Sequence, residues 1–412
     1  MLLNRIFIGM FIIPFIVALC KLIFWADVNI FDNMVKSLFD AAKNGFEFSL
    51  FLTGALCLWM GIMKIGEEGG AVKLLSKAVS PLFTRLFPEI PKDHPAVGSI
   101  MMNFSANMLG LDNAATPIGL KAMKEMQELN PNKERASNAQ IMFLVINTAG
   151  LTVIPVSILA FRSAAGSLNP SEVFIPILFT TFFTVIFGIL IVAIKQRINL
   201  FNKVILAYLG GMSALVIGLL FFIIKNPQYT ELISKVGGNM FLLGIIVLFI
   251  SLAMRKKVNV YDSFIEGAKG GFQVAINIIP YLVAILVAIS LLRSSGSLDA
   301  FQDGIKWCLH TFGIYADSVV DALPVAYMKT FSGSGARGLM LEIFDTYGVD
   351  SFTGKLAATF QGSTETTFYV LAVYFGSVKV TNTRYAAGAG LLTDVIGAII
   401  GIIIALIFFK YM

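Results

Sequence analysis

The chain has 412 residues, of which 57% are hydrophobic and only 14% are charged. Soluble domains carry about 25% charged residues, so this composition excludes an ordinary water-soluble protein and predicts an all-α polytopic membrane protein. The net charge of +6 needs no nucleic acid to explain it, and three scattered cysteines exclude a disulfide framework.

Several apolar runs approach or exceed the roughly 20 residues that cross a bilayer as a helix. The first, from Ile6 to Phe24, follows Arg5 but is not followed by a small-residue cleavage site. We therefore expect an uncleaved span there, not a signal peptide. The clearest later runs are 174–194, 204–224, 239–254 and 386–409. In total we expect about nine spanning helices.

Basic residues predict the orientation of these spans, because they favour cytoplasmic loops. Lys195, Arg197 and Lys203 form one cluster and 255-RKK-257 forms another, whereas the loop 225–235 between them is less basic. This pattern predicts a multi-pass protein of the cell (plasma or inner) membrane, with a cytoplasmic N-terminus and an external C-terminus.

The sequence also repeats itself. The segment 28-VNIFD-32 recurs as 258-VNVYD-262, 42-AKNGF-46 recurs as 268-AKGGF-272, and 146–161 aligns without gaps with 360–375. Each half then holds an interfacial amphipathic segment, a span, a small-and-polar interruption, a span with a polar centre and a closing span. An odd number of crossings between the halves predicts an inverted repeat, the arrangement of secondary transporters whose sites lie at the repeat interface. The predicted units are an N-terminal span 1–27, a first repeat 28–200, two connecting spans 201–257 and a second repeat 258–412.

Two interrupted stretches, 103–117 and 330–340, mix small and polar residues within apolar surroundings. Irregular backbone survives in a membrane only inside protein or beside a water-filled cavity, so we expect two re-entrant tips that line a substrate cavity. Close helix packing is the alternative, but it explains asparagines and an aspartate poorly. The candidate substrate-binding residues in these stretches are Asn103, Ser105, Asn107, Asn113, Thr116, Ser332 and Ser334, and Asp112 is a candidate ion-coupling acid.

The spans with polar centres add a second set of candidates. Asn147 aligns with Gln361, whereas Glu365 aligns with Leu151, so only the second half carries an acid. An ionisable group within a span costs about 2.5–3.5 kcal/mol and suggests function. Glu365 could carry a proton or help to hold a sodium ion; a carboxylate bonded to the backbone of the broken helix is the structural alternative. The substrate-binding candidates here are Asn147, Thr148, Gln361, Ser363, Thr364 and Thr366.

Three other charged residues leave two readings open. Lys329 and Arg337 flank the second tip, where they could contact an anionic substrate or extend to the headgroups. Asp394 lies in the last span, where its carboxylate is as well explained by pairing with another polar group inside the helix bundle as by the absence of such a partner.

These residues resemble a known family. The run 66–131 resembles bacterial spore maturation protein A, and the runs 258–284, 332–340 and 361–378 resemble spore maturation protein B, so the chain is similar to a fusion of the two. Each half resembles a nucleoside-recognition or "Gate" domain, a type related to concentrative nucleoside transporters. The resemblance implies two hairpins and two unwound helices around a central site.

No catalytic motif accompanies these features, since neither histidine has metal-ligand spacing and no P-loop lysine motif is present. We expect a non-enzymatic, secondary-transporter-like protein for a small polar solute such as a nucleoside or nucleobase. Coupling to H⁺ or Na⁺ is expected, with no metal and no other cofactor. The alternative is a non-transporting scaffold or regulator in envelope or spore maturation. The expected partners are the lipid bilayer, the solute and further copies of the chain, but no nucleic acid.

Overall fold

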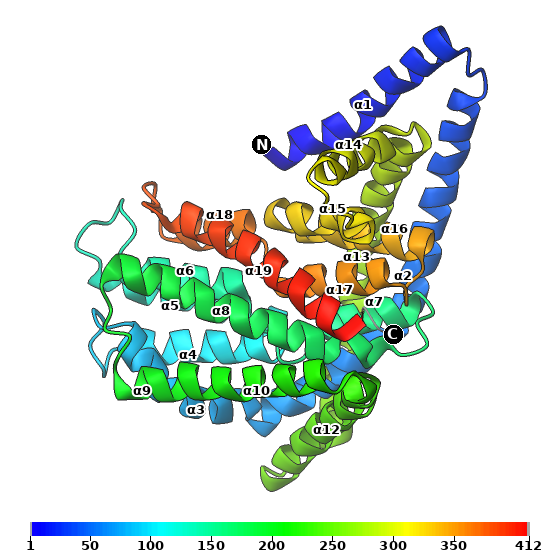
Figure 1. The fold of residues 1–412 in the computed structure, drawn as a ribbon. Helices are drawn as coiled ribbons and strands as arrows, with labels where there is room; N and C mark the ends of the chain where they lie inside the picture. Colours follow the sequence, from blue (N-terminus) through cyan, green and yellow to red (C-terminus); the bar gives the residue numbers. More distant parts are fainter. Residues whose placement is uncertain (1, 410–412) are drawn as a thin grey trace.

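All regular structure in the described part of the chain is helical. The structure is a computed structural model that describes residues 2–409, apart from the side chains of residues 2–4, 6, 112–114 and 235. Within these residues no strand forms, and one isolated bridge joins Arg135 to Asn382. The expected all-α fold is confirmed (Figure 1).

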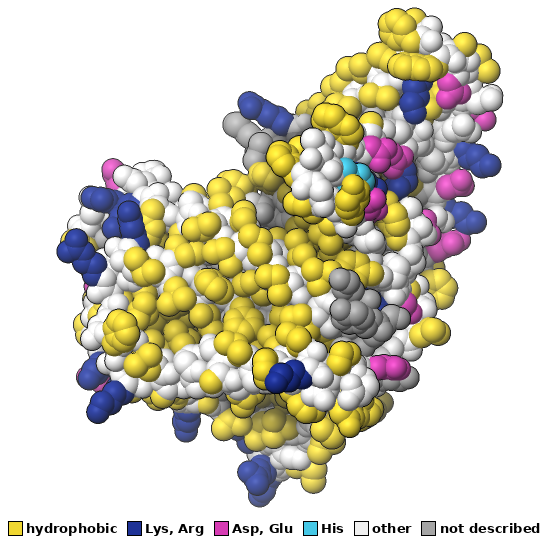
Figure 2. Space-filling view, in the orientation of Figure 1, with side chains coloured by type: hydrophobic (Ala, Val, Ile, Leu, Met, Phe, Trp, Pro, Cys, Tyr) yellow, Lys and Arg dark blue, Asp and Glu magenta, His cyan; other side chains and the backbone are white. Residues whose placement is uncertain are grey.

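Seven helices within the described residues are long and apolar enough to cross a membrane. They are α1 (Leu2–Trp25), α2 (Ile30–Gly69), α8 (Phe174–Gln196), α10 (Gly211–Lys225), α12 (Gly238–Arg255), α13 (Val260–Ser294) and α19 (Ala386–Phe409), with α8 and α10 extended by the short turns that precede them. Two further segments, 138–164 and 352–377, are helices broken near the middle; counting each as one crossing agrees with the expected number of about nine. Figure 2 shows hydrophobic side chains over most of the middle of one face, with Lys and Arg gathered at its margins. The protein is therefore a multi-pass membrane protein.

The same order of elements occurs twice. A long helix is followed by a short amphipathic helix, a pair of adjacent helices, a broken span and a closing span. The first half comprises α2, α3 (Ala71–Leu86), α4 (Pro95–Met108), α5 (Asp112–Leu129), α6 (Asn138–Ala149), α7 (Val156–Ala164) and α8. The second half comprises α13, α14 (Ser297–Thr311), α15 (Asp317–Phe331), α16 (Gly333–Tyr347), α17 (Phe352–Ser363), α18 (Thr367–Ser377) and α19. The elements between the halves are α9 (Lys203–Ile205), α10, α11 (Thr230–Leu232) and α12.

The helix that opens each half differs from the expectation. The sequence suggested an interfacial segment and a separate span, but α2 runs unbroken over 40 residues and α13 over 35. At 1.5 Å per residue α2 is about 60 Å long, twice the roughly 30 Å of the hydrocarbon core. The junctions hold no residue that ends a helix: Gly45 and Gly271 lie within the helices, and a lone glycine costs a helix only about 1 kcal/mol.

The two opening helices pack against each other in antiparallel directions. A Cβ added to Gly45 would lie 3.4 Å from the Cα of Val283, and one added to Gly271 would lie 2.8 Å from the Cα of Cys57. Gly45 and Gly271 are matching residues of the repeated sequence, and Cys57 and Val283 lie equally far beyond them. The same contact is therefore made twice around a two-fold axis, and small residues let the backbones approach this closely.

The closing spans of the two halves meet in the same way. Thr180 of α8 lies against Gly401 of α19, while Thr393 of α19 lies against Gly188 of α8. Matching helices that pack antiparallel place the two halves in opposite orientations. The expected inverted repeat is confirmed.

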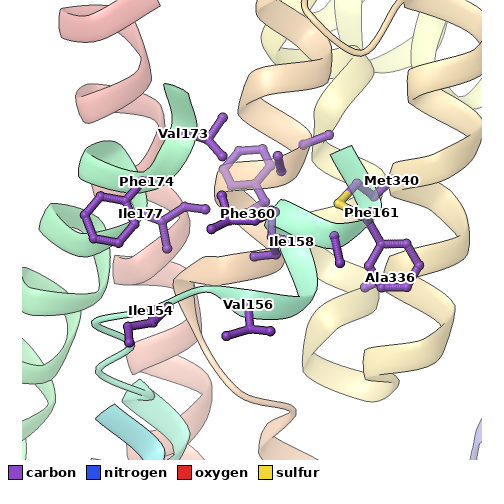
Figure 3. Packing of buried hydrophobic residues seen from close by; sticks show 14 of the residues in the cluster. Ile154, Val156, Ile158, Phe161, Val173, Phe174, Ile177, Ala336, Met340 and Phe360 are labelled. Carbon is purple, nitrogen blue, oxygen red and sulfur yellow. The ribbon is translucent and has the colours of Figure 1, made fainter. Parts of the chain in front are cut away.

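The core of the molecule lies where the broken spans of the two halves meet (Figure 3). Ile158 of α7 and Ile177 of α8 enclose Gly362 of α17, where an added Cβ would lie 2.7 and 2.8 Å from their side chains. Phe161 and Met340, one from each half, are at most 1% exposed in the same cluster. Apolar packing thus holds the helix breaks of the two halves at fixed positions.

Candidate functional site

Three of the helix breaks are joined by backbone hydrogen bonds. The first hairpin breaks at Gly110, whose φ of +69° is in the left-handed region that favours glycine, and an added Cβ would lie 2.8 Å from the Ile154 carbonyl oxygen. The Val153 amide donates to the Met108 carbonyl at 2.8 Å, which joins the break between α6 and α7 to the end of α4. The Glu365 amide donates to the Thr148 carbonyl at 2.8 Å, which joins the break between α17 and α18 to the end of α6. Irregular backbone from both halves therefore converges in one region.

The fourth break, between α15 and α16, lies beside the same region. It is a single residue, Ser332, whose hydroxyl accepts from the Gly335 amide at 3.0 Å and so caps α16. The Ser332 and Ser334 hydroxyls lie 3.2 Å apart. A Cβ added to Gly333 would lie 3.0 Å from the Thr366 hydroxyl oxygen, so this hairpin tip touches the break between α17 and α18.

Side-chain amides of the first half form a network that the structure brings together. The Asn107 side-chain nitrogen donates to the Asn147 side-chain oxygen at 2.9 Å and to that of Asn103 at 3.4 Å. The Asn147 nitrogen donates to the Phe143 carbonyl at 2.9 Å. The Tyr374 hydroxyl of α18 lies 3.4 Å from the Asn147 oxygen and 3.5 Å from the Asn103 nitrogen. Sequence reasoning missed Tyr374, because a tyrosine in a span looks like an ordinary interfacial residue.

Three predicted residues have buried polar atoms with no hydrogen-bond partner among the described residues: the Ser105 hydroxyl, the Thr148 hydroxyl and the side-chain oxygen of Gln361. Each of these residues is at most 6% exposed. Most buried polar atoms in native proteins are paired, so unpaired ones require an explanation. Gln361 occupies the position of Asn147 in the repeat, yet Asn147 is fully engaged in the amide network. Unpaired donors and acceptors are therefore present where the breaks converge.

The acid that the sequence singled out lies at the surface of this region. The Glu365 side chain is exposed, and its Cγ would be 3.3 Å from a Cβ on Gly150, at the end of α6. Gly150 has a φ of +57°, so its left-handed conformation ends α6 where the Glu365 backbone approaches. The Glu365 backbone is thus fixed at the contact between the two halves, and its side chain remains exposed.

The remaining predicted residues have different surroundings. The Ser363 hydroxyl donates to the Phe360 carbonyl at 2.8 Å, so its polar group is used within α17. Thr364 and Thr366 are buried beside α19 and the second hairpin respectively, and Thr116 is half-buried on α5. The side chains of Asp112 and Asn113 lie outside the described residues, so both remain predictions. Among the described side chains, no three His, Cys, Asp or Glu residues gather as a metal site would require.

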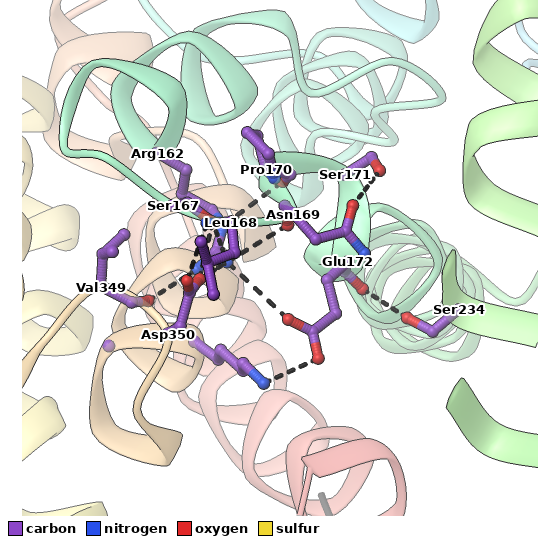
Figure 4. A network of polar contacts seen from close by, with 12 residues as sticks. Arg162, Ser167, Leu168, Asn169, Pro170, Ser171, Glu172, Ser234, Val349 and Asp350 are labelled. Carbon is purple, nitrogen blue, oxygen red and sulfur yellow. Dashed lines mark hydrogen bonds and ion pairs between the residues drawn. The ribbon is translucent and has the colours of Figure 1, made fainter. Parts of the chain in front are cut away.

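A second polar cluster lies apart from the breaks and links loops of the two halves (Figure 4). Arg162 is fully buried and donates to the Val349 carbonyl at 2.9 Å, to Asp350 at 2.8 Å and to the Ser167 hydroxyl at 2.9 Å. Lys355 pairs with Glu172 at 2.7 Å. Burial alone would raise the pKa of Asp350, but hydrogen bonds from Ser167 and the Leu168 amide, with the charges of Arg162 and Lys355, outweigh it and hold that pKa below its usual range. This cluster therefore joins the first half to the second half through hydrogen bonds and ion pairs.

The matching loops at the opposite end are joined without charge pairs. The Glu134 carbonyl accepts from the amides of Thr381 and Asn382, each at 3.0 Å. The Arg384 guanidinium donates to the Ala136 carbonyl at 3.1 Å and to the Asn138 side chain at 2.9 Å. Here too a loop of one half is tied to a loop of the other.

Comparison with known proteins identifies relatives for both halves. Residues 50–165 and 275–381 match the sequence model of the Gate family, which is described as nucleoside recognition. The chain is 38% identical to spore maturation protein A of Bacillus subtilis (strain 168) over 188 residues, which cover 46% of this chain and 92% of that protein. It is 47% identical to spore maturation protein B of the same organism over 154 residues, which cover 37% of this chain and 84% of that protein. No solved structure matches. The two matched segments contain all four helix breaks, and the resemblance seen in the sequence is confirmed.

Proposed function

The chain belongs to the Gate family of nucleoside-recognition membrane proteins, and on that premise we propose that it is a secondary transporter for a small polar solute. The solute binds where the four helix breaks converge. The observation that carries the proposal is the set of buried, unpartnered polar atoms of Ser105, Thr148 and Gln361 in that region. A solute with both donors and acceptors, such as a nucleoside or nucleobase, would satisfy them.

The architecture supports movement of the solute rather than binding alone. Inverted repeats with broken helices allow one structural unit to rock against the other around a fixed site. The site here is formed by both halves, since Thr148 belongs to α6 and Gln361 to α17. A proton or sodium gradient drives transport in this proposal, with Glu365 as one candidate for ion coupling. The protein then lies in the cell membrane with a cytoplasmic N-terminus.

Binding is tested by thermal melting of the purified chain against nucleosides, nucleobases, amino acids and short peptides, with and without sodium, at two pH values. A solute that binds the folded state raises the midpoint of melting. We expect such a solute to act on the wild type and not on Gln361→Met, which removes the unpartnered oxygen. Ser363→Ala is the matched control, because that hydroxyl is engaged within α17. A panel in which no compound shifts the wild type would contradict the proposal.

Transport is tested by flux of that solute into proteoliposomes under a proton or sodium gradient. Wild-type protein should show gradient-driven flux, and Glu365→Gln should lose the dependence on the gradient if Glu365 couples the ion. Unchanged gradient-driven flux in Glu365→Gln would exclude Glu365 from coupling without excluding transport.

The names of both relatives favour a second candidate function, because they refer to spore maturation and not to transport. The chain would then be a membrane scaffold or regulator, on its own or as an oligomer. This candidate predicts no flux and tolerance of changes at Thr148 and Gln361. Loss of a maturation phenotype on substitution of these residues would exclude it.

A further inference from the structure

Asp394 is a buried carboxylate in the last span that the amide network does not use. Its side chain is 8% exposed. The Thr367 hydroxyl donates to one carboxylate oxygen, Oδ2, at 2.7 Å. The other oxygen, Oδ1, is buried and has no hydrogen-bond partner among the described residues. A carboxylate left with an unpartnered oxygen in a low-dielectric region is costly unless it is protonated or a cation completes its surroundings.

Two glycines of α19 let the break between α17 and α18 pack against this carboxylate. Gly390 and Gly397 lie about one turn to either side of Asp394 on α19. An added Cβ would lie 2.8 Å from the Thr367 methyl group at Gly390 and 2.9 Å from the Thr364 methyl group at Gly397. Only residues without a Cβ permit this approach, so Thr364 and Thr367 flank Asp394 because of the sequence of α19.

The hairpin tip of the second half also faces Asp394. The Thr330 hydroxyl and the charge of Lys329, both in the last turn of α15, act on this carboxylate together with the Thr364 hydroxyl. Thr330 is 7% exposed and Thr364 is 5% exposed. The donor atoms around Asp394 are thus hydroxyl oxygens, and the charged group that faces it from a neighbouring element is Lys329.

The helix ends at these breaks nearly cancel in charge. α15 ends at Phe331 and α17 ends at Ser363, whereas α16 begins at Gly333 and α18 begins at Thr367. Each C-terminal end carries about half a negative charge, and each N-terminal end carries about half a positive charge. These breaks therefore contribute oxygen atoms to a cation site and no net negative charge.

We propose that Asp394, together with the hydroxyls of Thr364, Thr367 and Thr330, binds a sodium ion at the break between α17 and α18. Oxygen ligands from a carboxylate, from hydroxyls and from the carbonyl ends of half-helices suit a hard monovalent cation. The Thr367 oxygen keeps its lone pairs available while its hydrogen is donated to Asp394. This site rests on the proposed function, because it supplies the ion whose gradient drives the solute. It assigns that role to the buried Asp394 in place of the exposed Glu365.

The test measures sodium binding to the full chain without any solute. The midpoint of thermal melting is followed in detergent as sodium replaces choline at constant ionic strength, with potassium in a parallel series. We expect sodium to raise the midpoint of the wild type and of Asp345→Asn, a matched control that removes an exposed carboxylate from α16. Asp394→Asn should lose the response. Thr367→Val should need about tenfold more sodium for half of the response, a change of about 1.4 kcal/mol.

Several outcomes would overturn the site. A full sodium response in Asp394→Asn, no response in the wild type, equal responses to sodium and potassium, or a response to pH alone would each do so. If Asp394→Asn does not fold, Thr367→Val and Thr364→Val decide, since both keep the charge; an unchanged sodium requirement in both would reject the site. If sodium raises the melting midpoint but no solute does, the sodium site stands and the proposed transport is rejected. If a solute raises the midpoint but sodium does not, the sodium site is rejected and the proposed solute site stands.

Discussion

The two halves of the chain share one backbone plan but place different chemistry at equivalent points. At the break of the first half, Asn147 sits in a network of neutral amides in which every member has a partner. At the matching position of the second half, Gln361 has an unpartnered oxygen, and the neighbouring acid Asp394 has one as well. At these matching positions the first half therefore uses its amide within the structure, whereas the second half leaves its amide oxygen without a partner. Duplication of a fold preserves packing, and the polar side chains are free to diverge.

The loops that join the halves show the same contrast. One pair relies on the buried guanidinium of Arg162 and its carboxylate partner Asp350, whereas the matching pair at the opposite end relies on the backbone carbonyl of Glu134 and the exposed Arg384. Equivalent positions in an inverted repeat are thus joined by different kinds of contact.

The largest expected effect is at the charged loop pair. Arg162→Met should lower the free energy of unfolding by about 3 kcal/mol, because it leaves partners of a buried charge uncompensated. Arg384→Met, at the opposite end, should cost less than about 1 kcal/mol because that side chain is exposed. Denaturant titration in detergent measures both. Equal losses of free energy of unfolding in the two variants would show that the buried arginine does not stabilise its loop pair more than the exposed arginine does.

The next effect separates the matching amides. Asn147→Leu should cost about 2 kcal/mol, because Asn107 and Tyr374 each lose an acceptor in a buried setting. Gln361→Met should be close to neutral, since the replaced oxygen has no partner. The same denaturant titration compares them, and a greater loss for Gln361→Met would contradict the contrast drawn between the two amides.

A smaller effect concerns acid pH. The folded-state pKa of Asp350 is lowered, so its carboxylate stabilises the fold above the unfolded pKa of about 3.9. That stability is lost as the pH falls through the lower folded value. The melting midpoint of the wild type should therefore fall more steeply below about pH 4 than that of Asp350→Asn. Parallel curves for the two proteins would show that Asp350 does not contribute in this way.

The smallest change in stability is expected at the unpartnered hydroxyl of the first half. Thr148→Val should alter the free energy of unfolding by no more than about 0.5 kcal/mol, because no hydrogen bond is lost. It should nevertheless abolish the rise in melting midpoint produced by the transported solute. A variant that is much less stable would mean that the hydroxyl has a structural partner.

Much of this arrangement could be predicted from local sequence. Gly110 marks the first break, the asparagines at 103, 107 and 147 do meet, and the repeated segments indicate two inverted halves. Such features can be recognised in the sequence because a membrane tolerates irregular or polar segments only inside protein or beside a cavity.

Contacts between distant residues could not be predicted in the same way. Arg162 and Asp350 are 188 positions apart, and Tyr374 joins the amide network only through the packing of α18 on α6. The approach of Thr364 and Thr367 to Asp394 depends on glycines of α19 that resemble ordinary helix-packing residues. The spacing of residues along the sequence does not show which helices pack against each other in the fold.

The antiparallel contact of α2 with α13 also has a consequence for the time course of synthesis. The Glu68 carboxylate that accepts from the Ser263 hydroxyl is separated from it by 195 positions in the chain. At about 5–20 residues per second, a ribosome needs roughly 10–40 s to make that intervening length. Throughout this interval α2 is in the bilayer without the helix that its glycines accommodate. We expect the cysteine at position 57 to react faster with a membrane-permeant thiol reagent in a chain arrested before α13 than in the finished chain, where it is half-buried against α13.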